Sequence, residues 1–134
     1  MVRARLLKIV LVLVGLLFVA AVLPVVGGVL HPEQSDTGDT MQMALYATLG
    51  VFLLLAVRDP LANRSLILYS AWSSFAHAVV MSALGFRIPS QRVGFLVGSL
   101  VLVVVGVLLI VLLPPKRSGQ SATVIAGIPG HTSG

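Results

Sequence analysis

The chain has 134 residues, a mean hydropathy of +1.07 and only 10% charged side chains. A soluble domain carries about 25% charged residues, so the composition favours lipid as the main solvent. The net charge of +5 does not indicate a nucleic-acid partner, because the nine basic residues lie at the ends of apolar runs and form no single patch. The lack of cysteine excludes disulfides, thiol catalysis and thiolate metal sites.

Four apolar runs follow one another along the chain, at residues 9–30, 41–57, 66–86 and 93–113. Crossing the hydrocarbon core takes roughly 20 helical residues, with about 17 as the lower limit. Lipid offers no partner to free backbone groups, so such runs should be helical. With their flanking residues, the runs predict helices over about 6–30, 41–57, 60–86 and 92–113. The expected fold is an all-α, four-helix transmembrane bundle forming one domain over residues 1–115.

The first run follows a basic segment with Arg3, Arg5 and Lys8. A signal peptide cleaved near residues 19–21 is one interpretation of this pattern. The apolar stretch continues to Leu30, which is longer than a typical signal-peptide core, and this favours an uncleaved anchor. Pro24 predicts a kink near the outer end of the helix.

Turn-forming residues separate the predicted helices. The loop over residues 31–40 is polar, and Thr40 or Asp39 is expected to cap the second helix. Asp59 followed by Pro60 predicts the start of the third helix. The prolines at residues 114 and 115 end the fourth helix, since proline cannot continue one. Residues 116–134 are rich in Gly, Ser and Thr, which predicts a disordered cytoplasmic tail.

The basic residues also predict the orientation, because cytoplasmic ends of membrane helices carry an excess of Lys and Arg. Only Arg87 and Arg92 fall on one side of the predicted bundle. The other side holds Arg3, Arg5, Lys8, Arg58, Arg64, Lys116 and Arg117. Both termini are therefore expected in the cytoplasm. The glycosylation sequon at Asn63 would then lie on the wrong side of the membrane, so we interpret it as a chance match.

Small residues are expected to hold the helices together, because hydrophobicity inserts membrane helices without pairing them. The fourth helix carries Gly94 and Gly98 in a GxxxG pattern, and the first helix carries Gly15. These are predicted packing positions. The alternative is that glycine is simply frequent in membrane helices.

The third helix carries a group of polar side chains on one side. At 100° per residue, an arc of about 100° contains Ser70, Ser73, Ser74, His77 and Met81. A polar stripe within hydrocarbon should face protein. Trp72 points almost the opposite way, so it is expected to face lipid or a partner subunit.

His77 lies close to the predicted midplane, with Thr48 and Tyr46 of the second helix near its depth. One interpretation is a structural hydrogen bond from the imidazole to a serine, to Thr48 or to a carbonyl. The other is a ligand site for a quinone-like or tetrapyrrole group. A haem usually needs two axial ligands. Met81 is on the same helix as His77, and Met41 and Met43 are expected several ångströms from its depth. One chain therefore does not easily clamp a haem, although a homodimer could supply His77 twice.

Other functions find less support. A small transporter would want carboxylates within the membrane, whereas Asp59 is expected at the interface in a local ion pair with Arg58 or Arg64. One intramembrane histidine without cysteine disfavours zinc. No GxSxG, Walker A, HExxH or paired-carboxylate motif is present, so no enzyme activity and no cofactor are predicted.

The segment over residues 46–85 resembles an uncharacterised bacterial family of small four-helix membrane proteins, a domain of unknown function. The resemblance rests on Arg58-Asp59-Pro60, Asn63-Arg64-Ser65-Leu66, Ala71-Trp72-Ser73-Ser74 and His77. It implies a multi-pass protein of the bacterial inner membrane and supplies no activity or cofactor. The expected function is that of a non-enzymatic structural or accessory subunit of a membrane complex, with the lipid bilayer, other subunits or further copies of the chain as partners.

Overall fold

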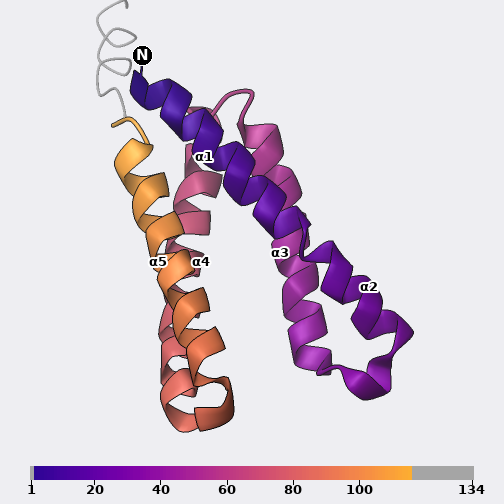
Figure 1. Ribbon diagram of the computed structural model, residues 1–134. Helices are drawn as coiled ribbons and strands as arrows, with labels where there is room; N and C mark the ends of the chain where they lie inside the picture. The colour runs from indigo at the N-terminus through magenta and orange to yellow at the C-terminus, as the bar shows by residue number, and fades with distance from the viewer. Residues whose placement is uncertain (1, 116–134) are drawn as a thin grey trace, which may run out of the picture.

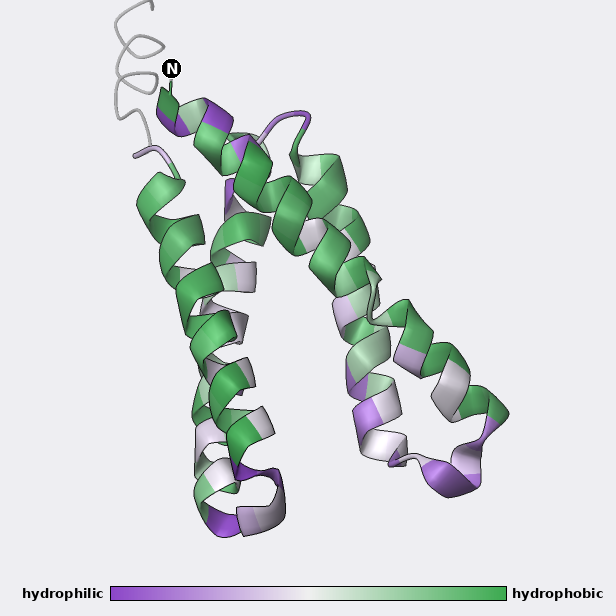
Figure 2. Ribbon diagram, in the orientation of Figure 1, coloured by the Kyte–Doolittle hydropathy of each residue, from purple (hydrophilic) through white to green (hydrophobic). Residues whose placement is uncertain are grey.

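The structure is a computed structural model that describes residues 2–115. The helices are α1 (Val2–Val19), α2 (Val22–Leu30), α3 (Thr37–Ala56), α4 (Arg64–Arg87) and α5 (Arg92–Leu112), with short 3-10 turns η1 (Pro32–Gln34) and η2 (Pro89–Gln91). α1 and α2 together form one interrupted span, so the described residues provide four segments long and apolar enough to cross a membrane. Figure 2 shows the apolar helix shafts and the hydrophilic loops between them. The predicted all-α four-helix bundle is confirmed, and the predicted disordered tail over residues 116–134 lies outside the described residues.

The first span is broken at Ala20 and Ala21, one turn before Pro24. Proline has no N–H, and its ring clashes with the carbonyl four residues earlier, which here belongs to Ala20. That carbonyl instead accepts the N–H of Leu23, three residues later, at 3.1 Å. The N–H of Ala21 likewise donates to the carbonyl three residues earlier, that of Phe18, at 3.0 Å. The kink expected at Pro24 is therefore present, but its bend falls one turn earlier.

Two helix starts differ from the sequence expectation. α3 begins at Thr37, because Asp36 and not Thr40 or Asp39 caps it, accepting from the N–H of Gly38 at 2.7 Å. α4 begins at Arg64 and not near Pro60. Asp59 closes the preceding turn, where its carboxylate accepts the N–H of Ala62 at 3.0 Å.

The helices form two arms that meet at one end and diverge toward the other (Figure 1). One arm is α1 and α2 packed on α3, and the other is the α4–α5 hairpin. We call the end near residues 2 and 113 the terminal end, and the end with the turns η1 and η2 the loop end. The buried core draws on both arms, mostly toward the terminal end, and consists of Leu7, Leu11, Val14, Phe18, Leu53, Ile67, Ala71, Val105, Leu109 and Leu113.

Glycines set the closest helix approaches. A Cβ atom at Gly50 of α3 would lie 2.7 Å from the backbone of α1, and Gly15 lies opposite on α1. On α5, a Cβ atom at Gly98 would meet the methyl group of Met81 at 2.7 Å. Gly94 has nothing within 4 Å of its Cβ position, so this half of the predicted GxxxG pair lies outside any helix contact.

Polar bonds fasten α4 to α5 near the loop end. The hydroxyls of Ser82 and Ser99 lie 2.6 Å apart, and Ser99 also donates to the carbonyl of Ala78 at 2.9 Å. An interhelical hydrogen bond of this kind is favourable within lipid, where a free polar group would find no water.

Two arginines close the terminal end. Arg3 donates to the carbonyls of Leu112 at 3.4 Å and Leu113 at 3.1 Å, and also to that of Val111. Arg64 donates to the carbonyl of Pro114. These cations satisfy the otherwise unpaired carbonyls at the end of α5, where the helix dipole favours positive charge.

The local ion pair expected for Asp59 is absent among the described residues. The Asp59 carboxylate accepts a backbone N–H of its own turn, while Arg64 turns to the end of α5 and Arg58 is exposed. An exposed ion pair contributes little to stability, so Asp59 and Arg64 bond to the backbone instead of to each other.

Candidate functional site

A cleft of about 800 Å³ lies between α3 and α4, on the side where the two arms diverge. Its walls are mostly apolar, with Leu49 and Phe52 on α3 and Val80 and Leu84 on α4. Polar side chains face it from both helices. From α3 come Asp39, Gln42, Tyr46 and Thr48, and from α4 come Tyr69, Ser73 and His77. An apolar cleft with a few convergent polar groups is the usual form of a ligand site.

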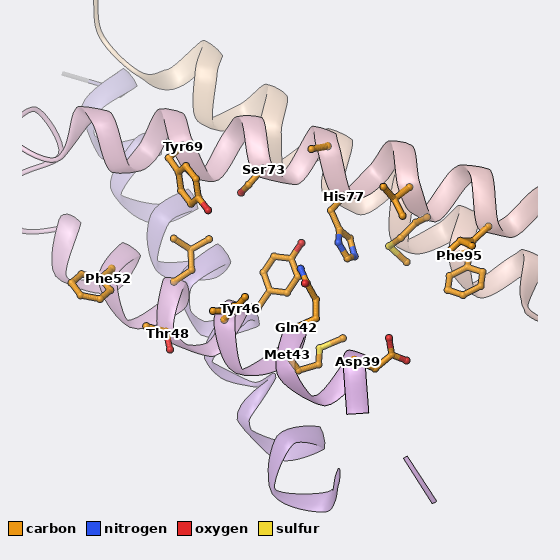
Figure 3. A pocket seen from close by; sticks show the side chains of 17 residues that line it. Asp39, Gln42, Met43, Tyr46, Thr48, Phe52, Tyr69, Ser73, His77 and Phe95 are labelled. Carbon is orange, nitrogen blue, oxygen red and sulfur yellow. The ribbon is translucent and has the colours of Figure 1, made fainter. Parts of the chain in front are cut away.

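His77 and Tyr46 lie at the same depth. At 1.5 Å per residue, His77 is about 15 Å from the loop end of α4, and Tyr46 is about 14 Å from the start of α3. Their rings meet edge to face with centroids 5.3 Å apart and planes at 88°. Phe18 of α1 supports the other side of Tyr46, with centroids 5.0 Å apart. Figure 3 shows His77 and Ser73 pointing from α4 toward Tyr46 and Gln42 on α3.

The imidazole of His77 is half-buried and makes no hydrogen bond to any described residue. The partners expected for it bond elsewhere: Thr48 donates to the carbonyl of Ala44 at 3.0 Å, and Ser73 donates to that of Ser70 at 3.1 Å. The hydrogen-bonding capacity of His77 is therefore directed into the cleft. A polar group at membrane depth without a protein partner is a marker of function.

The predicted polar arc divides into two groups. Ser70 and Ser74 are fully buried and donate to carbonyls of their own helix at 2.9 and 2.8 Å. Ser73 and His77 line the cleft. Serine in a membrane helix often bonds one turn back in this way, so Ser70 and Ser74 have a structural role, while Ser73 remains at the candidate site.

Trp72 lies on the outer side of α4, as expected, with 64% of its surface exposed. Its ring rests edge to face on Phe75, with centroids 5.7 Å apart. Phe75 in turn fills the space beside Gly106 of α5. Trp72 therefore presents a large aromatic surface to whatever surrounds the bundle.

Five further polar or sulfur-containing side chains line the cleft but were not predicted for the site, although Met81 lies on the predicted polar arc: Asp39, Gln42, Met43, Tyr69 and Met81. A signal for part of this set was available. Asp39, Gln42 and Tyr46 are spaced three and four residues apart, which places them on one helix face. The face opposite His77 is therefore polar along the loop-end half of α3.

The charge of the cleft restricts its ligand. Asp39 lies near the loop end and is the sole charged residue among the described residues that line the cleft. Arg87 and Arg92 lie at the same end of the molecule but do not line it. Among residues 2–115, no group of three or more His, Cys, Asp or Glu side chains is arranged to hold a metal ion. The site therefore suits neutral or cationic groups better than anions.

By length and composition of its helices, the protein is a multi-pass membrane protein, a four-helix bundle with a cleft between its two arms. The chain belongs to the DUF6632 family, a family of unknown function, whose model matches residues 2–126. No curated protein and no solved structure matches it.

Proposed function

We propose that the protein is a non-enzymatic membrane protein that binds a ligand in the cleft between its arms, with His77 as the principal polar contact. The observation that carries this proposal is the half-buried imidazole facing the cleft without a protein hydrogen bond. A purely structural bundle would gain by filling this space with apolar side chains, because an unpaired polar group within hydrocarbon is costly.

The lining favours some ligands over others. A quinone-like ring is neutral, and its carbonyl oxygens could accept from the donors of His77 and Tyr46. A tetrapyrrole that carries carboxylates fits less well, because among the described residues neither Lys nor Arg lines the cleft. A transporter would need a path to both sides of the membrane, whereas the core around Leu53, Ile67 and Leu109 closes the terminal end. Binding therefore accounts for the geometry better than transport.

The natural lack of cysteine allows a direct test of the cleft. Ser73→Cys places a thiol in the cleft, while the matched control Ser74→Cys places one at a fully buried position. We expect a small polar thiol reagent to modify Ser73→Cys at least about tenfold faster. Equal, slow modification of both would contradict an open cleft. Organic extraction of the purified protein and of His77→Phe, followed by mass spectrometry, tests for a resident neutral ligand that depends on the imidazole.

A second function, that of an accessory subunit in a membrane complex or an oligomer, is favoured by the exposure of Trp72. Aromatic side chains are typical anchors of protein interfaces. The positive-inside bias supports a cytoplasmic location for the terminal end, and the family resemblance supports a bacterial inner membrane. Crosslinking of a photoreactive residue at position 72 in native membranes tests this role, and an adduct with lipid alone would speak against it.

A further inference from the structure

Two methionines line the same cleft as His77, one from each wall. Met43 lies on α3 and Met81 lies on α4, one turn along from His77. Each is six residues from the loop end of its helix, so both lie at a depth of about 9 Å, and His77 lies about 6 Å deeper. Met43 and His77 therefore differ in depth by several ångströms, as the sequence predicts. Their side chains nevertheless line the same cleft.

These side chains have the chemistry of a soft-metal site. Thioether sulfur is a soft ligand that selects Cu(I), and imidazole also suits copper. Harder ions such as Mg²⁺ and Ca²⁺ prefer several oxygen ligands, whereas Asp39 contributes the sole carboxylate among the described cleft residues. Structural zinc sites usually use thiolates, and the chain has no cysteine.

The charge near the loop end suits a cation. Asp39 lines the cleft on its loop-end side, whereas Arg87 and Arg92 at the same end of the molecule do not line it. A fixed carboxylate at the mouth of a low-dielectric cleft raises the local concentration of cations. A neutral ring would use His77 but would leave the paired methionines and Asp39 without a role, whereas a soft cation uses all of them.

The methionine side chains can adjust to a metal. Methionine has three rotatable bonds and adapts its position readily. In the structure the methyl group of Met81 packs onto Gly98 of α5, so its sulfur turns toward a metal by a change of side-chain rotamer. Met41, by contrast, is 65% exposed and lies outside the cleft, although it is on the same helix as Met43.

We propose that His77, Met43 and Met81 bind a soft monovalent metal cation, Cu(I), which reaches them from the loop end past Asp39. This inference rests on the proposed ligand-binding function of the cleft and names the class of its ligand. The ion binds without a change in oxidation state, so the proposal needs no further reactant.

The test uses the full chain in detergent or nanodiscs, with Cu(I) as the sole added metal under anaerobic, reducing conditions. A chromophoric Cu(I) chelator competes for the ion and reports the affinity. Met43→Leu and Met81→Leu conserve side-chain volume, so they should leave the fold intact. We expect one bound ion per chain and an affinity loss of at least about tenfold for each variant and for His77→Phe, the scale on which metal sites respond to ligand-shell changes. Met41→Leu is the matched control and should bind like the unchanged chain.

A second measurement does not depend on variants. With ¹³C-labelled methionine methyl groups, titration of the unchanged protein with Ag(I), a redox-inert analogue of Cu(I), should shift the signals of Met43 and Met81 and leave that of Met41 in place. Equal shifts for all three, or binding that survives all three cleft substitutions together, would overturn the metal site. If Ser73→Cys is modified rapidly but no Cu(I) binds, the proposed open cleft is supported and the proposed Cu(I) site is wrong. If Ser73→Cys is as unreactive as Ser74→Cys, both proposals fail.

Discussion

The carbonyl oxygen of Gly15 lies only 2.7 Å from the position that a Cβ atom would occupy at Gly50. Backbone thus meets backbone where α1 crosses α3, and rigid main-chain atoms cannot move aside as a flexible side chain would. Close approach of this kind maximises van der Waals contact, which is the principal attraction between helices in lipid. The α1–α3 arm therefore depends on the absence of a side chain at residue 50.

We expect Gly50→Ala to destabilise the protein by about 1–3 kcal/mol, the usual cost of forcing extra atoms into a packed site. Gly94→Ala is the control, because its Cβ position is open and alanine favours helix. The free energy of unfolding in mixed detergent micelles measures both variants. Equal losses in the two proteins would show that the crossing is less tight than described.

The serine bonds between α4 and α5 provide a second prediction. Ser99→Ala removes interhelical bonds to Ser82 and Ala78, and should cost about 0.6 kcal/mol and at most roughly 1.7 kcal/mol. Ser74→Ala should cost less, because the carbonyl of Ser70 that it releases keeps its own helical partner. The same unfolding assay compares them, and a larger loss for Ser74→Ala would contradict this assignment.

Arg3 should protect the last turn of α5 from hydrogen exchange, since it binds the carbonyls that end the helix. Arg3→Gln is expected to speed amide exchange over residues 109–113 while leaving the middle of α5 unchanged. Arg5→Gln is the matched control, because no described bond joins Arg5 to α5. Hydrogen exchange measured by mass spectrometry compares the two variants. Identical exchange profiles over residues 109–113 would exclude the capping role of Arg3.

Trp72 is the single tryptophan of the chain, so its fluorescence reports one site. It lies about 12 Å along α4 from Arg64, within the hydrocarbon region of a bilayer. Lipids brominated on their acyl chains should quench it strongly, and aqueous iodide should not. Weak quenching by every brominated lipid would instead indicate that a partner protein or a second copy covers the ring.

The orientation can be tested on the same cysteine-free background. Ser90→Cys lies in the turn η2 at the loop end, and Arg58→Cys lies between α3 and α4 at the terminal end. In intact cells, a membrane-impermeant maleimide should label Ser90→Cys, and Arg58→Cys should react only after lysis. The reverse pattern would invert the proposed topology, and labelling of both in intact cells would refute a four-span bundle.

The sequence predicts the spans and the outward direction of Trp72 because both follow from length, hydropathy and helical periodicity. It does not predict which glycine pairs with which helix. Gly94 and Gly98 share one motif, yet only Gly98 meets a neighbour. Lipid solvates every apolar face equally, so helix pairing depends on shape across distant segments. For the same reason, the sequence does not predict that the two arms diverge or that a cleft lies between them.

Within the site, periodicity places His77 and Ser73 on one face but cannot separate them from Ser70 and Ser74. That separation arises because helix packing buries Ser70 and Ser74, whereas Ser73 and His77 face the cleft. The facing of Met43 and Met81 across the cleft also escapes the sequence, since it depends on how far the two arms open. The pattern along one helix predicts the side on which each side chain lies. A binding site also depends on the distance between two helices, which that pattern does not contain.

The bonds from Arg3 to the end of α5 join two segments that lie 109 and 110 residues apart in the sequence. Translation proceeds at roughly 5–20 residues per second, and segments fold in the order in which they emerge. Synthesis of the residues between Arg3 and its carbonyl partners therefore takes at least several seconds, so this contact forms late. The contact closes a loop through all the described helices, and a chain truncated before residue 111 would lack every carbonyl that Arg3 binds.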